Sequence, residues 1–263
     1  MLADYHLHTS FSADCDNNME GAIQRAIELQ LDEVCFTEHL DYGNKWDYPC
    51  DCEGYWREWR RCQERYCDQI GIRFGMEFGM QVYTIPRFQE IFARYPLDFV
   101  ILSCHQIDGC QFGSFSFYKG KEKEQKACNR IYYEEILHLI EQYTDYSVLG
   151  HLDVIRRYER SEYYEFEQVK DLVEEILRRV IAQGKGIEVN TSSFRYKLPD
   201  LTPGREILKM YKELGGEILT IGSDAHTNEW IGCEIKSIQD ELKEMGFHAI
   251  YTFDQMQPVR HEL

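Results

Sequence analysis

Seven short apolar runs in this chain each end at side chains that can bind a metal ion. The endings are His6 and His8, Glu38 and His39, Glu77, His105, His151, Glu188 and Asn190, and Asp224 and His226. Histidine marks five of the seven endings, whereas the third offers only Glu77 and the sixth offers a carboxylate and an amide. Strands that end repeatedly at such side chains are typical of a barrel with its chemistry at one rim.

Segments with helical periodicity separate the apolar runs. They cover residues 19–31, 55–70, 122–143, 165–183, 203–214 and 234–245. We expect Asn17 or Asn18 to cap the first helix and Pro203 to take the first position of the fifth. Gly184 and Gly215 should end the fourth and fifth helices. Strands that alternate with helices in this way pair in parallel, because parallel neighbours need a crossover of about a dozen residues.

An open doubly wound sheet and a closed barrel both fit this alternation. The barrel is favoured because candidate ligands end almost every strand and no glycine-rich dinucleotide loop follows any strand. We therefore predict an α/β barrel with the site at the carboxyl-terminal rim of its strands, in a single domain over residues 1–263. The segment 248–253 (HAIYTF) is either an eighth strand or a tail. Insertions over 43–54 and 106–121 should border the site.

Composition excludes several classes of function. The 263 residues carry a formal net charge of −17, which argues against a nucleic-acid partner. No apolar stretch approaches the roughly 18 to 20 residues that span a bilayer, and no charged-then-apolar leader opens the chain. We expect a cytoplasmic protein whose ten cysteines are reduced. Cys50, Cys52, Cys62 and Cys67 match no strong zinc pattern, so we predict a structural or incidental role for them.

The side chains at the strand ends suit catalytic metal ions. His6 and His8 are two residues apart on a strand and should share a face, as should Asp224 and His226. Imidazole with carboxylate fits zinc, iron or manganese, and the lack of thiolates argues against a purely structural site. The ligands are too many for one ion, and Glu77 can bridge two. Two ions about 3.5 to 4 Å apart serve the hydrolysis of a phosphate ester.

The strand-end motifs resemble those of the polymerase and histidinol phosphatase (PHP) superfamily. They read DYHLHTSFSAD, TEH, GMEFG, SCH, GHLD, EVNTS and GSDAH, and the resemblance runs from residue 4 to about 253. The histidinol-phosphate phosphatases are the more similar branch, through DYHLHTSFS, GHLDVIRRY, EVNTSSFR and GSDAH. The resemblance implies a distorted, TIM-like (β/α)7 barrel with a trinuclear metal centre. We expect two or three divalent ions of zinc, iron or manganese.

The resemblance also distributes the ligands over three sites. The first ion would take His6, His8, Glu77 and Asp224; the second would share Glu77 and add His105 and His151; the third would take His39 and His226. Members of the superfamily often have a histidine where this chain has Asp14, and a carboxylate there can complete the third site. The alternative for Asp14 is a local role as a turn or cap residue.

Phosphate binding calls for arginine, whose planar fork matches two phosphate oxygens. Arg195 follows the sixth run, within the resembling EVNTSSFR stretch, and is our candidate for phosphate binding and for catalysis. Of Arg156 and Arg157, we expect one to face the site. Asn190, together with Glu188, is a candidate for substrate contact, and the alternative for both is to close the rim.

Two further carboxylates and a basic run border these motifs. Asp153 and Glu38 are candidates for orienting a ligating imidazole or moving a proton, and Asp153 is our second catalytic candidate. Lys119, Lys121 and Lys123 fit the solvated start of a helix.

The expected reaction is in-line attack of a metal-bound hydroxide on a phosphomonoester. The resemblance implies L-histidinol phosphate as substrate, giving L-histidinol and phosphate in histidine biosynthesis. One alternative is a PHP-type phosphoesterase acting on another phosphomonoester or a nucleotide. Another is a metal-binding accessory module without catalysis. The expected partner is a small molecule and not a membrane, and self-association is left open.

Overall fold

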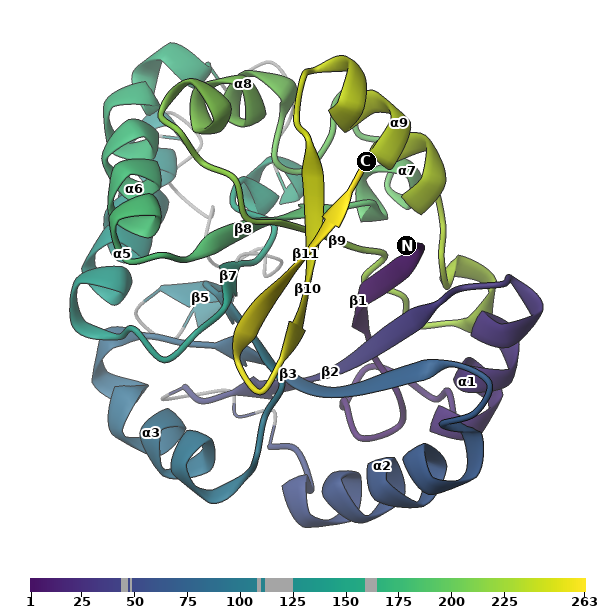
Figure 1. Cartoon of the computed structure of the whole chain (residues 1–263). Coiled ribbons are helices and arrows are strands. Elements are labelled where there is room, and N and C mark those ends of the chain that lie inside the picture. Colours follow the sequence, from purple (N-terminus) through teal and green to yellow (C-terminus); the bar gives the residue numbers. More distant parts are fainter. Residues whose placement is uncertain (44–46, 48, 108–109, 112–124, 159–164) are drawn as a thin grey trace.

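The computed structural model has a seven-stranded parallel sheet that curls into a barrel surrounded by helices (Figure 1). It describes the whole chain except residues 44–46, 48, 108–109, 112–124 and 159–164. The strands lie in the order β1 (Ala3–Leu7), β2 (Glu33–Asp41), β3 (Gly71–Gly79), β4 (Phe99–Ser103), β7 (Val148–Leu149), β8 (Gly186–Asn190) and β9 (Leu219–Gly222). A parallel bridge between Leu7 and Ala225 brings the two edges together. The predicted (β/α)7 barrel is confirmed.

Helices cover the outer face of the barrel. They are α1 (Met19–Glu28), α2 (Cys52–Tyr66), α3 (Ile85–Arg94), α5 (Gln125–Gln142), α6 (Lys170–Ala182), α7 (Ser192–Arg195), α8 (Arg205–Glu213) and α9 (Ile235–Glu244). Short 3-10 turns lie at Val82–Thr84, Val154–Tyr158, Phe166–Gln168 and Asn228–Trp230. Asn18 caps α1 by accepting from the Gly21 N–H, as predicted. Gly184 and Gly215 follow α6 and α8 with positive φ, which closes both helices where the sequence placed their ends.

Two helix predictions need correction, and one helix was missed. Helix α2 begins at Cys52, within the segment that we expected to be an insertion, because the Asp51 side chain caps it through the Gly54 N–H. Helix α3 was not predicted at all. Pro203 does not open α8; it precedes the cap residue Gly204, and the helix starts at Arg205.

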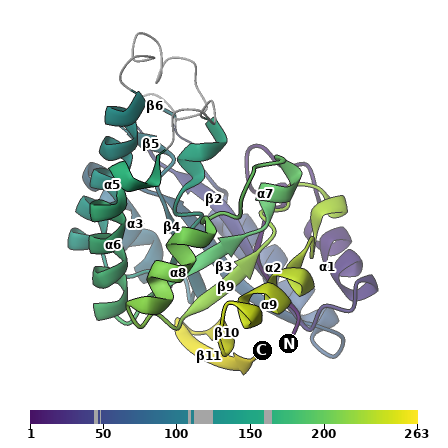
Figure 2. The same cartoon turned by 90° about the horizontal axis from the view of Figure 1, so that it is seen from above.

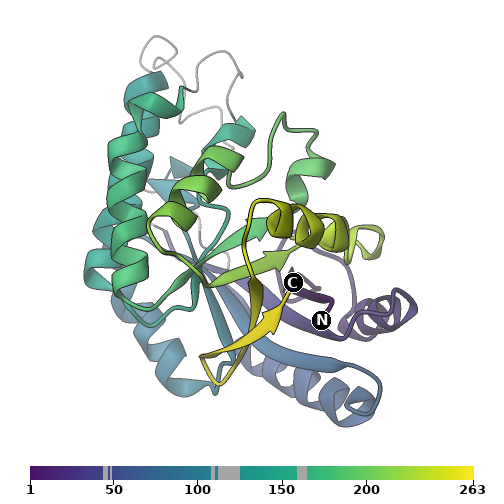
Figure 3. The ribbon, with the colours of Figure 1, turned by 45° about the horizontal axis from the view of Figure 1, so that its top comes forward.

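The carboxyl-terminal segment closes the end of the barrel opposite the carboxyl ends of the strands. The segment predicted as an eighth strand or a tail does form a strand, β10 (Ala249–Asp254), but it pairs with β11 (Gln257–Glu262) in an antiparallel hairpin and not with the barrel sheet. Phe253 N–H donates to the Tyr5 hydroxyl at 2.9 Å, and the Met256 N–H donates to the Asp98 carbonyl oxygen. Figure 2 shows the hairpin at one end of the barrel, and Figure 3 shows it crossing in front of the strands. The carboxyl ends of the strands, where the sequence predicts the site, lie at the opposite rim.

Two cores support this arrangement. The larger core fills the space between sheet and helices and includes Phe36, Phe78 and Leu177. The smaller core lies inside the barrel, where Tyr5 and Phe99 pack with residues of the hairpin. The barrel interior beside the hairpin is thus mainly apolar, although Glu33 is buried there and accepts from the Tyr5 hydroxyl.

Several predictions fall partly or wholly on residues outside this description. The segment 106–121 is described only at β5 (Gln106–Ile107) and β6 (Cys110–Gln111), which pair antiparallel. Lys119, Lys121 and Lys123 lie outside the described residues. Among the helices that are described, none is both long and apolar enough to cross a membrane.

Candidate metal centre

A β-bulge in β1 sets the direction of the His6 and His8 side chains. Tyr5 packs inside the barrel, whereas Leu7, two residues later, packs in the outer core. Regular alternation would place both on one face, but the register to β2 shifts between Asp4 and Leu7. The shift turns His6, and with it His8, toward the interior of the rim, where both side chains are buried.

Glu77 stands at the centre of the rim, and its two oxygens face different histidines. Oε2 lies 3.2 Å from His6 Nε2 and 2.8 Å from His39 Nδ1. Oε1 lies 2.8 Å from His151 Nε2 and 3.2 Å from His105 Nε2. A carboxylate that bridges two ions needs its oxygens divided between two ligand sets in this way.

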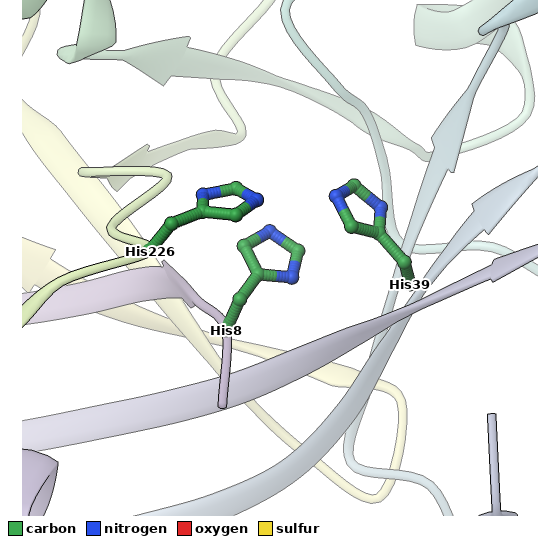
Figure 4. Close-up of side chains that lie close together, drawn as sticks. All are labelled: His8, His39 and His226. Carbon is green, nitrogen blue, oxygen red and sulfur yellow. The ribbon is translucent and has the colours of Figure 1, made fainter. Parts of the chain in front are cut away.

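A second group gathers beside Glu77. Figure 4 shows His8, His39 and His226 approaching one another from the end of β1, from β2 and from the segment after β9. The ring centroid of His8 lies 4.1 Å from that of His39 and 4.3 Å from that of His226. Asp14 Oδ2 lies 3.3 Å from His226 Nε2 and 3.8 Å from His39 Nε2. Asp14 thus stands where the third site was predicted, although its side chain is 55% exposed.

The donor atoms fit bound cations. Three groups each bring their ligand atoms within 4.8 Å of one another: His8 with His39 and His226, His6 with His8 and Glu77, and His39 with Glu77 and His105. His8 and His39 therefore belong to two groups each, so the three ligand sets inferred from the resemblance are not separate in space. His8 Nε2 is buried without a hydrogen-bond partner among the described residues. Lone pairs left in this state are what a metal ion satisfies.

The pKa values of two buried carboxylates also indicate positive charge within the cluster. Burial alone would raise the pKa of Glu77, but His6, His39 and His105 outweigh it and hold the pKa well below its usual value. Burial likewise opposes ionisation of Asp224, yet His8 and the neighbouring cations keep its pKa well below the ordinary range. Two ionised carboxylates buried at one rim require positive charge beside them.

Two of the seven described residues other than glycine that have positive φ are predicted ligands. His151 has a φ of 22° and Asp224 has a φ of 54°, which are positive values that residues other than glycine rarely adopt. Asp224 lies with Oδ1 3.6 Å from His8 Nε2 and 3.9 Å from His6 Nε2. Such conformations persist where the surrounding structure enforces them, and they cluster at functional sites.

Buried carboxylates orient two of the imidazoles through their Nδ1 atoms. Asp41 Oδ1 lies 2.8 Å from His105 Nδ1, and Glu188 Oε1 lies 2.5 Å from His6 Nδ1. Each contact directs the Nε2 atom of its histidine toward Glu77, the arrangement by which metal-binding histidines are usually oriented. Asp41 was missed in the sequence, although it lies two residues after His39 on the same strand face. Glu188 was considered only for substrate contact or for closing the rim.

Glu38 fixes His8 through Ser12. The Ser12 hydroxyl donates to Glu38 Oε2 at 2.6 Å and lies 3.2 Å from His8 Nδ1. Because the Ser12 proton goes to Glu38, the Ser12 oxygen accepts from His8 Nδ1–H, and the lone pair of His8 is left on Nε2. The expectation that Glu38 orients an imidazole agrees with this chain of contacts.

Two arginines converge on Asp224 at the rim. Arg157 Nη2 donates to the Ser192 hydroxyl at 2.7 Å and to Asp224 Oδ2 at 3.3 Å. Arg195 Nη1 donates to the Asp224 carbonyl oxygen at 2.9 Å. A cavity of about 300 Å³ opens beside them, lined by Asp14, Arg195, Tyr196, His226, Thr227 and Trp230. Positive charge therefore lies next to the candidate metal ligands, at an opening sized for a small molecule.

Three other candidates face the protein instead. Arg156 Nη1 donates to Asp153 Oδ2 at 2.9 Å, and the same oxygen accepts from the Gly204 N–H. No imidazole contact of Asp153 is found in the described part of the chain, so the structure favours a role for this pair in holding the loop before α8. Asn190 is fully buried and accepts from the Ser192 N–H at 3.0 Å, which favours a structural role over the predicted substrate contact.

The cysteine cluster takes no part in this centre. Cys62 is buried within α2, Cys67 is exposed at its end, and the Cys52 thiol donates to the Cys50 carbonyl oxygen at 3.5 Å. Among the described residues, the groups able to hold a metal contain histidine and glutamate but no cysteine.

Comparison with known proteins agrees with this geometry. Residues 4–192 match the PHP domain model. The chain is 31% identical to the histidinol-phosphatase of Lactococcus lactis, over 96% of this chain and 94% of that protein. It is 28% identical to a probable histidinol-phosphatase of Thermotoga maritima, over 95% and 94% of the two chains.

A solved structure extends the likeness to three dimensions. The crystal structure of the Lactococcus lactis histidinol phosphate phosphatase, in complex with zinc, L-histidinol and phosphate, superposes with a TM-score of 0.89. It is 30% identical and covers 98% of both chains. A protein of Listeria monocytogenes shares the fold with a TM-score of 0.77 at 21% identity, over 89% of this chain and 99% of that one. The chain therefore belongs to the PHP domain family.

Proposed function

We propose that this protein is a divalent-metal-dependent phosphomonoesterase that hydrolyses L-histidinol phosphate to L-histidinol and phosphate. The observation that carries the proposal is the match, over 98% of both chains, to an enzyme whose structure holds zinc, L-histidinol and phosphate. The cluster around Glu77 and the two arginines at Asp224 supply the side chains that such a reaction needs.

The histidines and carboxylates of the rim would hold two or three ions of zinc, iron or manganese. Bound divalent ions would lower the pKa of a water molecule and withdraw charge from the phosphate oxygens. Zinc in the related structure and the overlapping ligand groups of this chain support the proposal. Asp14 would complete the third site with His39 and His226. Elemental analysis after dialysis against each metal would count the ions and identify them.

Arg157 and Arg195 would bind the phosphoryl group. Arg157 Nε is buried without a partner among the described residues, so this guanidinium has a donor left for a ligand. Both cations would neutralise the charge that spreads over the equatorial oxygens as water attacks phosphorus in line and the alkoxide leaves. Arg195 would in this way take part in catalysis as well as binding.

A substrate panel tests the proposal. The metal-reconstituted protein should release phosphate from histidinol phosphate with a kcat/KM at least about 100-fold above that for p-nitrophenyl phosphate and nucleoside monophosphates, a margin of about 3 kcal/mol. Glu77→Gln is the negative control, since an amide cannot bridge two ions. Equal turnover of all substrates would reject histidinol phosphate as the preferred one, and no turnover by fully metal-loaded protein would reject the enzyme.

A further inference from the structure

One aromatic ring contacts both arginines of the rim. The Arg157 guanidinium carbon lies 4.0 Å from the centroid of the Tyr196 ring, and that of Arg195 lies 5.0 Å from it. Tyr196 follows directly after α7 and lines the cavity beside Asp14 and His226. The ring is 47% exposed, so it is not part of the hydrophobic core.

The two arginines need such a partner because they are close to each other and alike in charge. Both donate to Asp224, but to different atoms: Arg157 to the carboxylate and Arg195 to the main-chain carbonyl. Those bonds hold one nitrogen of each guanidinium, and the Tyr196 ring adds a further contact to each group. The negative face of an aromatic ring attracts a cation and favours a guanidinium plane stacked on it.

We propose that Tyr196 is a positioning residue, which holds Arg157 and Arg195 in the orientation that binds the phosphoryl group of the substrate. This inference rests on the proposed function, because it assigns phosphate to the two arginines. The ring acts through its face, and its hydroxyl is not needed. Tyr196 therefore sets the affinity for phosphate and takes no direct part in bond breaking.

The consequence is a selective effect on binding. Without the ring, each arginine must be ordered by the phosphate itself, which weakens the binding of substrate and of inorganic phosphate together. Loss of two partly exposed cation–π contacts corresponds to a change in affinity of about five- to thirtyfold. An effect shared by the bound substrate and the transition state raises KM and leaves kcat nearly constant.

Three variants of the metal-reconstituted full chain test the inference. Tyr196→Leu removes the ring, Tyr196→Phe keeps it, and Phe194→Leu makes the matching change at a neighbouring ring that is 42% exposed. Steady-state kinetics with histidinol phosphate would give KM and kcat, and calorimetric titration with inorganic phosphate would give Kd. Thermal melts would verify that all variants fold.

The expected result is a rise of about five- to thirtyfold in both KM and the phosphate Kd for Tyr196→Leu, with kcat within about threefold. Tyr196→Phe and Phe194→Leu should stay within about twofold of wild type. Unchanged phosphate binding in Tyr196→Leu would overturn the inference, and so would an equal loss in Tyr196→Phe, which would assign the effect to the hydroxyl. Phosphate titration does not depend on turnover, so failure of the proposed substrate leaves this test decisive.

Discussion

Individual side chains around the rim gain their direction from partners that are not themselves ligands. His105 and His6 each turn one ring nitrogen toward Glu77 because a buried carboxylate accepts from the other nitrogen. A ring fixed in this way loses little freedom when it binds an ion, and the carboxylate makes the imidazole a stronger base. We expect metal affinity to depend on Asp41 and Glu188 nearly as much as on the ligands.

Asp41→Asn tests that dependence at one residue. The amide keeps the shape of the side chain but removes the charge that faces His105 Nδ1, so metal affinity and kcat/KM should each fall about 10- to 100-fold. Competition with a chromophoric chelator measures the affinity. Asp254→Asn is the matched control. Asp254 lies in the hairpin at the other end of the barrel, where it pairs with Arg73 of β3. Equal losses in both variants, or none in Asp41→Asn, would contradict the argument.

At the scale of elements, close approach of neighbouring strands decides whether the ligands fit. The bulge in β1 brings His6 against β9, where a Cβ built on Gly222 would lie 2.3 Å from the His6 Cβ. It would also lie 2.7 Å from Glu188 Oε1, which orients the same histidine. A side chain at residue 222 is therefore incompatible with the position of His6.

We predict that Gly222→Ala displaces His6 and removes the activity. The added methyl group meets the stem of a buried side chain, which cannot rotate away, so the free energy of unfolding should fall by about 1–3 kcal/mol. Urea titration and metal analysis of the same samples measure both effects. Gly21→Ala in α1 is the control, since alanine in a helix should change stability by no more than about 1 kcal/mol. Full metal content and activity in Gly222→Ala would show that His6 can shift without loss.

Sequence reasoning located the strand ends well, because the carboxyl ends of parallel strands must meet at one rim. His6, Glu77 and His151 were predicted as ligands on that ground, and the structure brings them together. The bulge could not be predicted, since a change of face depends on hydrogen-bond register. Whether a polar residue beyond a strand faces the cavity or a loop depends on distant contacts, as for Asp153, which the Gly204 N–H binds.

At the scale of the whole molecule, the two ends of the chain close the barrel together. Strand β1 meets the segment after β9 through the bridge between Leu7 and Ala225, and the hairpin β10–β11 binds Tyr5. The larger core includes residues from Leu7 to Ile250 without a break between the two halves of the sheet. We therefore propose that residues 1–263 fold as one domain, in which neither half is stable alone.

Urea unfolding tests this cooperativity and the metal centre together. Trp56 and Trp59 on α2 report on the amino-terminal half and Trp230 on the cavity, so tryptophan fluorescence and far-UV circular dichroism should give coincident single transitions. Chelation should lower the midpoint without splitting the transition, because ions that bind only the folded chain add about 2.7 kcal/mol at a free concentration 100-fold above Kd. Adding the metal back should restore the midpoint. Two separate transitions would show two domains, and a midpoint that ignores chelation would show that the histidines of the rim bind no ion strongly.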